Sequence, residues 1–170
     1  MKVLGPKSFP DLLVIFEEEN RFKDGWYEAH IKDKWPRDRF NEANQQLKEW
    51  NEVLLSHDDL LDVKLHWNDD FGIPREGMTV SEALNLPLFL RWISEGKHKV
   101  LPDSHVWLAT EPLRPGPEEH KLLKNYEGRL VTLDGIHRLL AWAASGKEVI
   151  RAYVAGKLPE GIVRGNVTPV

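Results

Sequence analysis

The stretch LVTLDGIHRLLAW, residues 130–142, decides how the fold and the function of this chain are predicted. Its first four residues predict a short strand, Asp134-Gly135 predicts a tight turn, and the apolar spacing that follows predicts a helix over 136–145. A helix N-terminus has unsatisfied N–H donors and a partial positive charge, so it suits an anion. Gly135 lets a ligand approach the backbone, and Arg138 can hold a phosphate in bidentate fashion. The stretch therefore predicts a phosphate or other anion site.

The composition is that of a soluble globular protein. The chain has 170 residues, of which 41% are hydrophobic and 29% charged, enough for one domain with a sizeable core. A formal net charge of -4 argues against a nucleic-acid partner, because duplex binders usually carry a basic surplus. The sequence contains no cysteine, which excludes disulfides, thiolate metal sites and a cysteine nucleophile. We expect a cytoplasmic protein with no signal peptide and no membrane partner; the sequence leaves the oligomeric state open.

Periodicity along the chain predicts one α+β domain over residues 1–170, with a helical N-terminal part over 1–60. Apolar spacing predicts helices over residues 12–21, 37–56, 80–95 and 117–125, and strands over 1–4, 60–67, 106–109, 130–133 and 148–154. Pro87 should bend or divide the third helix, because proline lacks the N–H that an interior helix position donates. Gly146 is expected to end the helix of the opening stretch.

The order of motifs from residue 131 to 154 resembles that of one known superfamily. The motifs are VTL (131–133), DG (134–135), IHR (136–138), an Ala-rich helix, SGK (145–147) and VIRAYV (149–154). This pattern is similar to the ParB/sulfiredoxin superfamily, including its free-serine kinases. The resemblance implies that residues 61–170 form a compact domain with a small mixed sheet flanked by helices. The N-terminal helices would be extra, and they could cap the site.

The same resemblance implies a nucleotide site. Family members bind nucleotide phosphates at the start of this helix, so the cofactor-binding residues would be Gly135, Ile136, His137 and Arg138, with ATP or CTP and Mg²⁺ as the ligands. Asp134 would hold the metal ion or act as a base; its alternative role is to cap the helix. Ile136 stands where sulfiredoxins have their reactive cysteine, which excludes that chemistry.

Four residues are candidates for catalysis: Asp134, His137, Asp103 and His105. Asp103 and His105 precede the strand predicted over 106–109 and could face the cleft. The alternative for His137 and Arg138 is that they face solvent or pair with acids.

Three further groups have simpler explanations as well as functional ones. His57-Asp58-Asp59 with His66 could bind a metal ion, although such a cluster is more often a polar helix terminus. Trp26, Trp35 and Trp67 could each stack a nucleobase. The acidic run over 17–19 is most simply a solvated helix face.

Four functions compete at this stage. The first is a nucleotide-dependent enzyme, a small-molecule kinase or nucleotide hydrolase that acts on a small hydroxyl substrate. The second is a ParB-like nucleotide switch without phosphoryl transfer, and the third is an accessory protein of a biosynthetic pathway that has lost the nucleotide site. The fourth is a nucleic-acid module, against which the charge balance argues.

Overall fold

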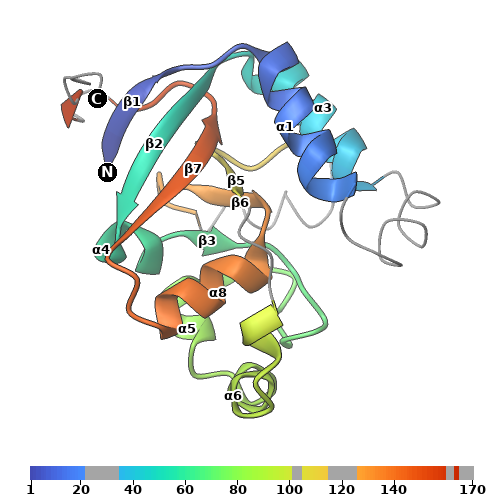
Figure 1. Cartoon of the computed structure of the whole chain (residues 1–170), viewed down its shortest axis with the longest axis vertical. Helices are drawn as coiled ribbons and strands as arrows, with labels where there is room; N and C mark the ends of the chain where they lie inside the picture. Colours follow the sequence, from blue (N-terminus) through green and yellow to red (C-terminus); the bar gives the residue numbers. More distant parts are fainter. Residues whose placement is uncertain (22–34, 101–104, 115–125, 160–162, 165–170) are drawn as a thin grey trace.

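A mixed sheet with strand order β4-β3-β6-β5-β7-β2-β1-β8 runs through the computed structural model (Figure 1), which describes residues 1–21, 35–100, 105–114, 126–159 and 163–164. The strands are β1 (Lys2–Pro6), β2 (Trp50–Ser56), β3 (Lys64–Leu65), β4 (Met78–Thr79), β5 (Val106–Ala109), β6 (Val131–Asp134), β7 (Val149–Ala155) and β8 (Val163–Arg164). The helices are α1 (Phe9–Arg21), α3 (Trp35–Leu47), α4 (His57–Leu61), α5 (Val80–Ala83), α6 (Pro87–Ser94), the 3-10 helix η1 (Lys97–Val100) and α8 (Ile136–Ala144). The fold is α+β, as predicted.

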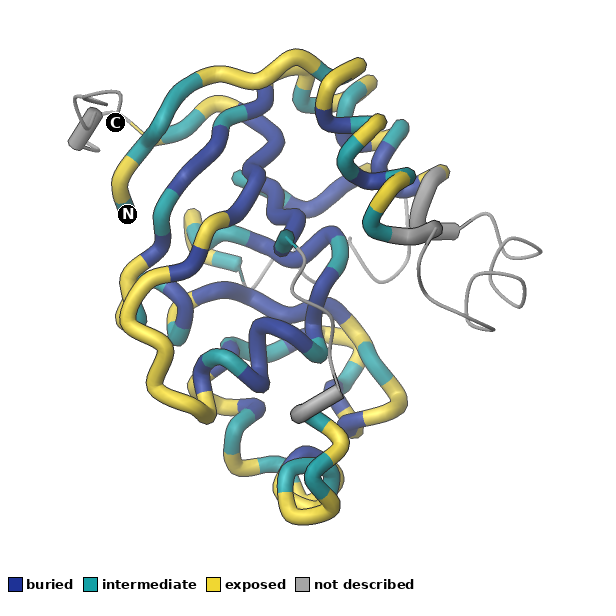
Figure 2. The backbone as a smooth tube through the Cα atoms, viewed as in Figure 1, coloured by how far each residue is buried: buried dark blue, intermediate teal, exposed yellow. Residues whose placement is uncertain are grey.

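Helices cover both faces of the sheet. α1 and α3 lie side by side on one side, whereas α8, α5 and α6 lie on the other (Figure 1). The strand β5 shows why both faces are apolar, because its side chains alternate between two separate clusters. Trp107 and Ala109 pack under α1 and α3, and Val106 and Leu108 pack against α8. The central strands are accordingly buried along their length, and the outer surfaces of the helices are exposed (Figure 2).

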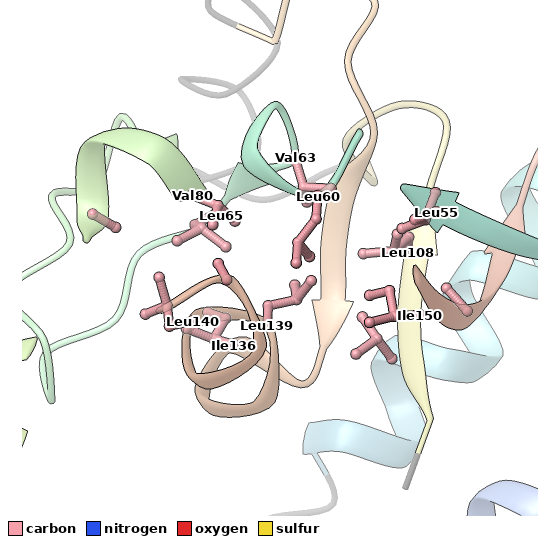
Figure 3. Packing of buried hydrophobic residues seen from close by; sticks show 14 of the residues in the cluster. Leu55, Leu60, Val63, Leu65, Val80, Leu108, Ile136, Leu139, Leu140 and Ile150 are labelled. Atoms are coloured by element: carbon pink, nitrogen blue, oxygen red, sulfur yellow. The ribbon is translucent and has the colours of Figure 1, made fainter. Parts of the chain in front are cut away.

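We name the two clusters for the helices that cover them. The α1–α3 core consists of Leu12, Phe16, Phe40, Ala43, Trp50, Trp107, Ala109, Leu113, Leu133, Tyr153 and Ala155. The α8 core includes Leu55, Leu60, Val63, Leu65, Val80, Leu108, Ile136, Leu139, Leu140 and Ile150 (Figure 3). The side chain of Ile136 belongs to the α8 core, so only its backbone is available to a ligand.

The prediction of one helix over residues 37–56 is wrong. α3 ends at Leu47, and residues 50–56 form β2, which pairs antiparallel with β7 from Trp50↔Ala155 to Ser56↔Val149. Lys48 has φ 63, a left-handed conformation that turns the chain out of the helix. Because β2 lies inside a sheet covered on both faces, its apolar residues do not alternate regularly, and their spacing also fits a helix.

The prediction of a strand over residues 60–67 is right only at Lys64–Leu65, where β3 lies. The residues before it form α4, a helix that begins at a Ser56 cap rather than ending near His57. The predicted division at Pro87 is confirmed, since α5 and α6 are separate helices. The helix predicted over 117–125 lies outside the described residues. Within the described part of the chain, none of the helices is long and apolar enough to cross a membrane.

Candidate anion-binding site at the start of α8

The turn between β6 and α8 is a glycine N-cap with left-handed backbone. Gly135 has φ 99 and ψ 26, and no side chain caps the helix. Its carbonyl accepts the first helical hydrogen bond, from the N–H of Leu139 at 2.9 Å. The N–H groups of the first turn are therefore not occupied by a capping side chain, and they lie at the positive end of the helix dipole. The strand, turn and helix predicted from residues 130–145 are confirmed, with Gly146 following the helix at φ 69.

Arg138 folds back over this turn. The residue is 5% exposed, and its Nη2 donates to Oδ2 of Asp134 at 3.4 Å, a long hydrogen bond. A Cβ atom placed on Gly135 would lie 3.0 Å from Nη2 and 3.4 Å from Nε of Arg138. The buried Nε has no acceptor among the described residues. The guanidinium of Arg138, whose Nε has no acceptor among the described residues, thus lies against the backbone at the start of α8.

The position of Arg138 is unfavourable without negative charge nearby. It is the third residue of α8, where the helix dipole favours an anion and disfavours a cation. Two carboxylates offset the guanidinium: Asp134 and, from α1, Glu19, whose pKa Arg138 helps to lower. The Asp134 side chain is 26% exposed. The Nε of Arg138 has no acceptor among the described residues, although Asp134 lies beside the same guanidinium.

His137 lies on the α6 side of the turn. Its ring packs against Phe71 at 4.7 Å and Trp92 at 5.8 Å, and its Nε2 is 3.3 Å from Oδ2 of Asp70. Burial lowers the pKa of His137, although the charges of Asp70 and Asp134 oppose the shift. His137 is thus an imidazole held mainly by apolar rings, beside but not bonded to Arg138.

His105 is held by Glu19, which lies in the acidic run over 17–19. The backbone N–H of His105 donates to Glu19 Oε1 at 2.8 Å, and its ring Nδ1 makes a short hydrogen bond to the same oxygen. The Glu19 side chain is 14% exposed. The prediction that the acidic run is a solvated helix face is therefore wrong for Glu19, because sequence spacing could not show that the α1 carboxylate faces a residue 86 positions away. Asp103 lies outside the described residues.

His66 is hydrogen-bonded to β6, a position that was not predicted from the sequence. The ring Nδ1 of His66 is 2.7 Å from Oγ1 and 3.1 Å from the carbonyl oxygen of Thr132. Burial, assisted by the charge of Arg39 on α3, lowers the pKa of His66 to about 3. His66 is therefore neutral at ordinary pH and supports the strand that ends at Asp134.

A comparison with known proteins places the chain in a family. The model of a family of unknown function, DUF6309, matches residues 1–168. The chain belongs to that family. No curated protein and no solved structure matches it.

In this DUF6309 protein the other predicted groups do not assemble into a site. Asp59 is engaged by the backbone and hydroxyl of Ser56 at the start of α4, and His66 bonds to β6, so the proposed metal cluster is not formed. Within the described residues no group of three or more histidine or acidic side chains could hold a metal ion. Trp67 is 36% exposed, but the guanidinium of Arg75 lies 5.0 Å from its ring.

Proposed function

We propose that this protein binds the phosphates of a nucleoside triphosphate, ATP or CTP, at the start of α8. One observation carries the proposal: the buried Arg138 guanidinium, whose Nε has no acceptor among the described residues, lies over a glycine turn without a side-chain cap. Backbone N–H groups and a guanidinium that converge on one spot are the usual means of holding phosphate oxygens. The resemblance to the ParB/sulfiredoxin superfamily supports the same choice of ligand.

The proposed reaction is phosphoryl transfer to a small hydroxyl substrate or to water. Arg138 and the first N–H groups of α8 would bind the phosphates and offset the charge that develops on the transferred group. His137 would lie at the flank of the phosphates. Asp134 fits Mg²⁺, because this ion takes one or two carboxylates from a protein and its remaining ligands from phosphate and water. We further propose a cytoplasmic location, where both nucleotides and Mg²⁺ are available.

Nucleotide-dependent thermal unfolding tests the binding step. Millimolar ATP–Mg²⁺ or CTP–Mg²⁺ should raise the Tm, since a ligand that binds only the folded state stabilises it by about 2.7 kcal/mol at a hundred times its Kd. Arg138→Ala should abolish the rise. The matched control is Arg91→Ala, which removes an equal charge from a side chain that is 75% exposed and should keep the rise. If neither nucleotide changes the Tm of the wild-type chain, the proposal is wrong.

Release of the diphosphate then separates the possible activities. Release that requires an added hydroxyl compound identifies a kinase, whereas release in buffer alone identifies a hydrolase. Binding without release identifies a nucleotide switch, the alternative among the predicted functions that retains the same site.

A further inference from the structure

We infer that Glu19 and His105 form the proton-accepting unit of this site, in which Glu19 fixes the imidazole and Nε2 of His105 takes the proton of the hydroxyl substrate. The inference rests on the proposed phosphoryl transfer and names the group that activates its nucleophile. In this arrangement His105 is the catalytic residue and Glu19 is a positioning residue.

The contact between the two residues determines which ring nitrogen is available. Glu19 Oε1 receives the backbone N–H of His105 at 2.8 Å and also contacts its Nδ1. A carboxylate has no proton to give, so Nδ1 must carry the hydrogen, and whenever the ring is neutral Nε2 is its unprotonated nitrogen. Nε2 makes no hydrogen bond to any of the described residues, and the side chain is 29% exposed.

Glu19 is suited to this role because it keeps its charge. Burial alone would raise its pKa, but hydrogen bonds from the side chain and backbone of His105, with the charge of Arg138, lower it below the ordinary value. Tyr153 supports the other side of the unit, since its ring lies 4.8 Å from the imidazole. The imidazole is thus fixed both in tautomer and in orientation.

The sheet register brings this unit to the anion-binding corner. β5 and β6 are antiparallel, with Trp107 opposite Asp134, so the residue before β5 lies next to the turn that follows β6. Val106, the neighbour of His105, has its Cγ2 3.4 Å from the position of a Cβ on Gly135. Glu19 also interacts with the charge of Arg138. His105 and the proposed phosphate site therefore lie at the same end of the adjacent strands β5 and β6.

The step balances without any additional reagent. The substrate oxygen forms a bond to the γ-phosphorus as the bond from that phosphorus to the bridging oxygen breaks. The diphosphate leaves with that electron pair. The hydroxyl proton passes to Nε2 of His105 and is later released to solvent, so that alcohol and ATP give phosphate ester, ADP and a proton.

Long-range ¹H–¹⁵N NMR of the histidine rings in the full chain tests this inference, with His105→Gln used to assign the signal. At pH 8 the wild-type spectrum should show Nδ1 protonated and Nε2 bare, and Glu19→Gln should give a mixture of tautomers. Addition of ATP–Mg²⁺ should shift the Nε2 resonance in the wild type and in Arg91→Ala but not in Arg138→Ala.

The outcomes separate this inference from the proposed function. A protonated Nε2 in the wild type overturns the inference directly. A rise in Tm with ATP–Mg²⁺ and an unmoved His105 resonance overturns it while the nucleotide site stands. If ATP–Mg²⁺ neither raises the Tm nor shifts the His105 resonance, both the inference and the proposed function are wrong.

Discussion

The starts of α5 and α8 are built on opposite principles, although both follow a strand that pairs with β3. At α5, Thr79 has extended backbone, its hydroxyl accepts from the N–H of Glu82 at 3.3 Å, and Glu82 accepts from the N–H of Thr79 at 2.7 Å. This capping box satisfies two donors with side chains of the helix itself. At α8 the cap is Gly135 in left-handed conformation, and the third residue is Arg138 instead of an acid.

The difference separates a helix start whose N–H donors are satisfied by side chains from one that has no side-chain cap. α4 begins as α5 does, with Ser56 and Asp59 in a capping box. α6 also lacks a side-chain cap, but it opens with Pro87, which has no N–H to satisfy, and no cation follows in its first turn. Of the four helix starts compared, those of α4, α5, α6 and α8, the start of α8 combines N–H donors that lack a side-chain cap with a buried guanidinium.

The largest expected effect comes from giving α8 the acidic third residue that α4 and α5 have. Arg138→Glu replaces the cation with an anion, so we expect ATP–Mg²⁺ affinity to fall more than about a hundredfold, or about 2.7 kcal/mol. Isothermal titration calorimetry measures it, with circular dichroism to verify folding. Arg91→Glu makes the same charge change on the surface of α6 and should leave the affinity within about threefold. Equal affinities for both variants would contradict the comparison.

Two glycine substitutions separate backbone strain from loss of the site. Gly135 and Gly146 both have positive φ, so alanine at either should cost about 1–2 kcal/mol of unfolding free energy. A methyl group on Gly135 also meets Arg138 at 3.0 Å, whereas nothing lies within 4 Å of one on Gly146. Urea unfolding should therefore show a larger loss for Gly135→Ala, and only this variant should weaken ATP binding. An identical loss of affinity in both variants would show that strain alone is responsible.

Acid should destabilise the fold through His66, which is hydrogen-bonded to Thr132 of β6. The pKa of His66 is about 3 in the folded protein, against 6.5 for an ordinary histidine. Between these values the unfolded chain binds a proton that the folded chain does not, so stability falls as pH drops from 6.5. The loss should be about 1.5 kcal/mol between pH 6.5 and 5.

Urea unfolding across that range checks this linkage, and His66→Gln should flatten the dependence. Glu82 has a lowered pKa, with an ordinary value of 4.5, and stays ionised in this window, so the α5 cap is unaffected. Hydrogen exchange should accordingly rise at the start of α8 before that of α5. A pH slope that is unchanged in His66→Gln would assign the titration to another group.

The smallest effect is expected at the structural start. Thr79→Ala removes the cap hydroxyl of α5 and should cost about 1 kcal/mol of unfolding free energy. ATP affinity should not change, because α5 contributes no group to the site. Paired urea unfolding and calorimetry measure both quantities; a weakened affinity would mean that the two helix starts are coupled through β3.

The sequence by itself determined the features that depend on a few neighbouring residues. The strand, turn and helix over 130–145 were predictable because Gly135 permits positive φ and the apolar spacing after it fits a helix. The division at Pro87 follows from its missing N–H. The α+β class and Arg138 as a candidate for anion binding came from the same local signals.

Only the tertiary structure decided what depends on contacts between distant segments. Residues 50–56 are a strand because β1 and β7 pair with them, and burial on both faces erased the alternation that would have marked them in the sequence. The pairing of Glu19 with His105 spans 86 residues, and that of His66 with Thr132 spans 66. The sequence around a carboxylate or an imidazole is no different for an exposed residue than for a residue in a site. The positions of Glu19 and His105 therefore depend on the packing of α1 and on the register of the sheet.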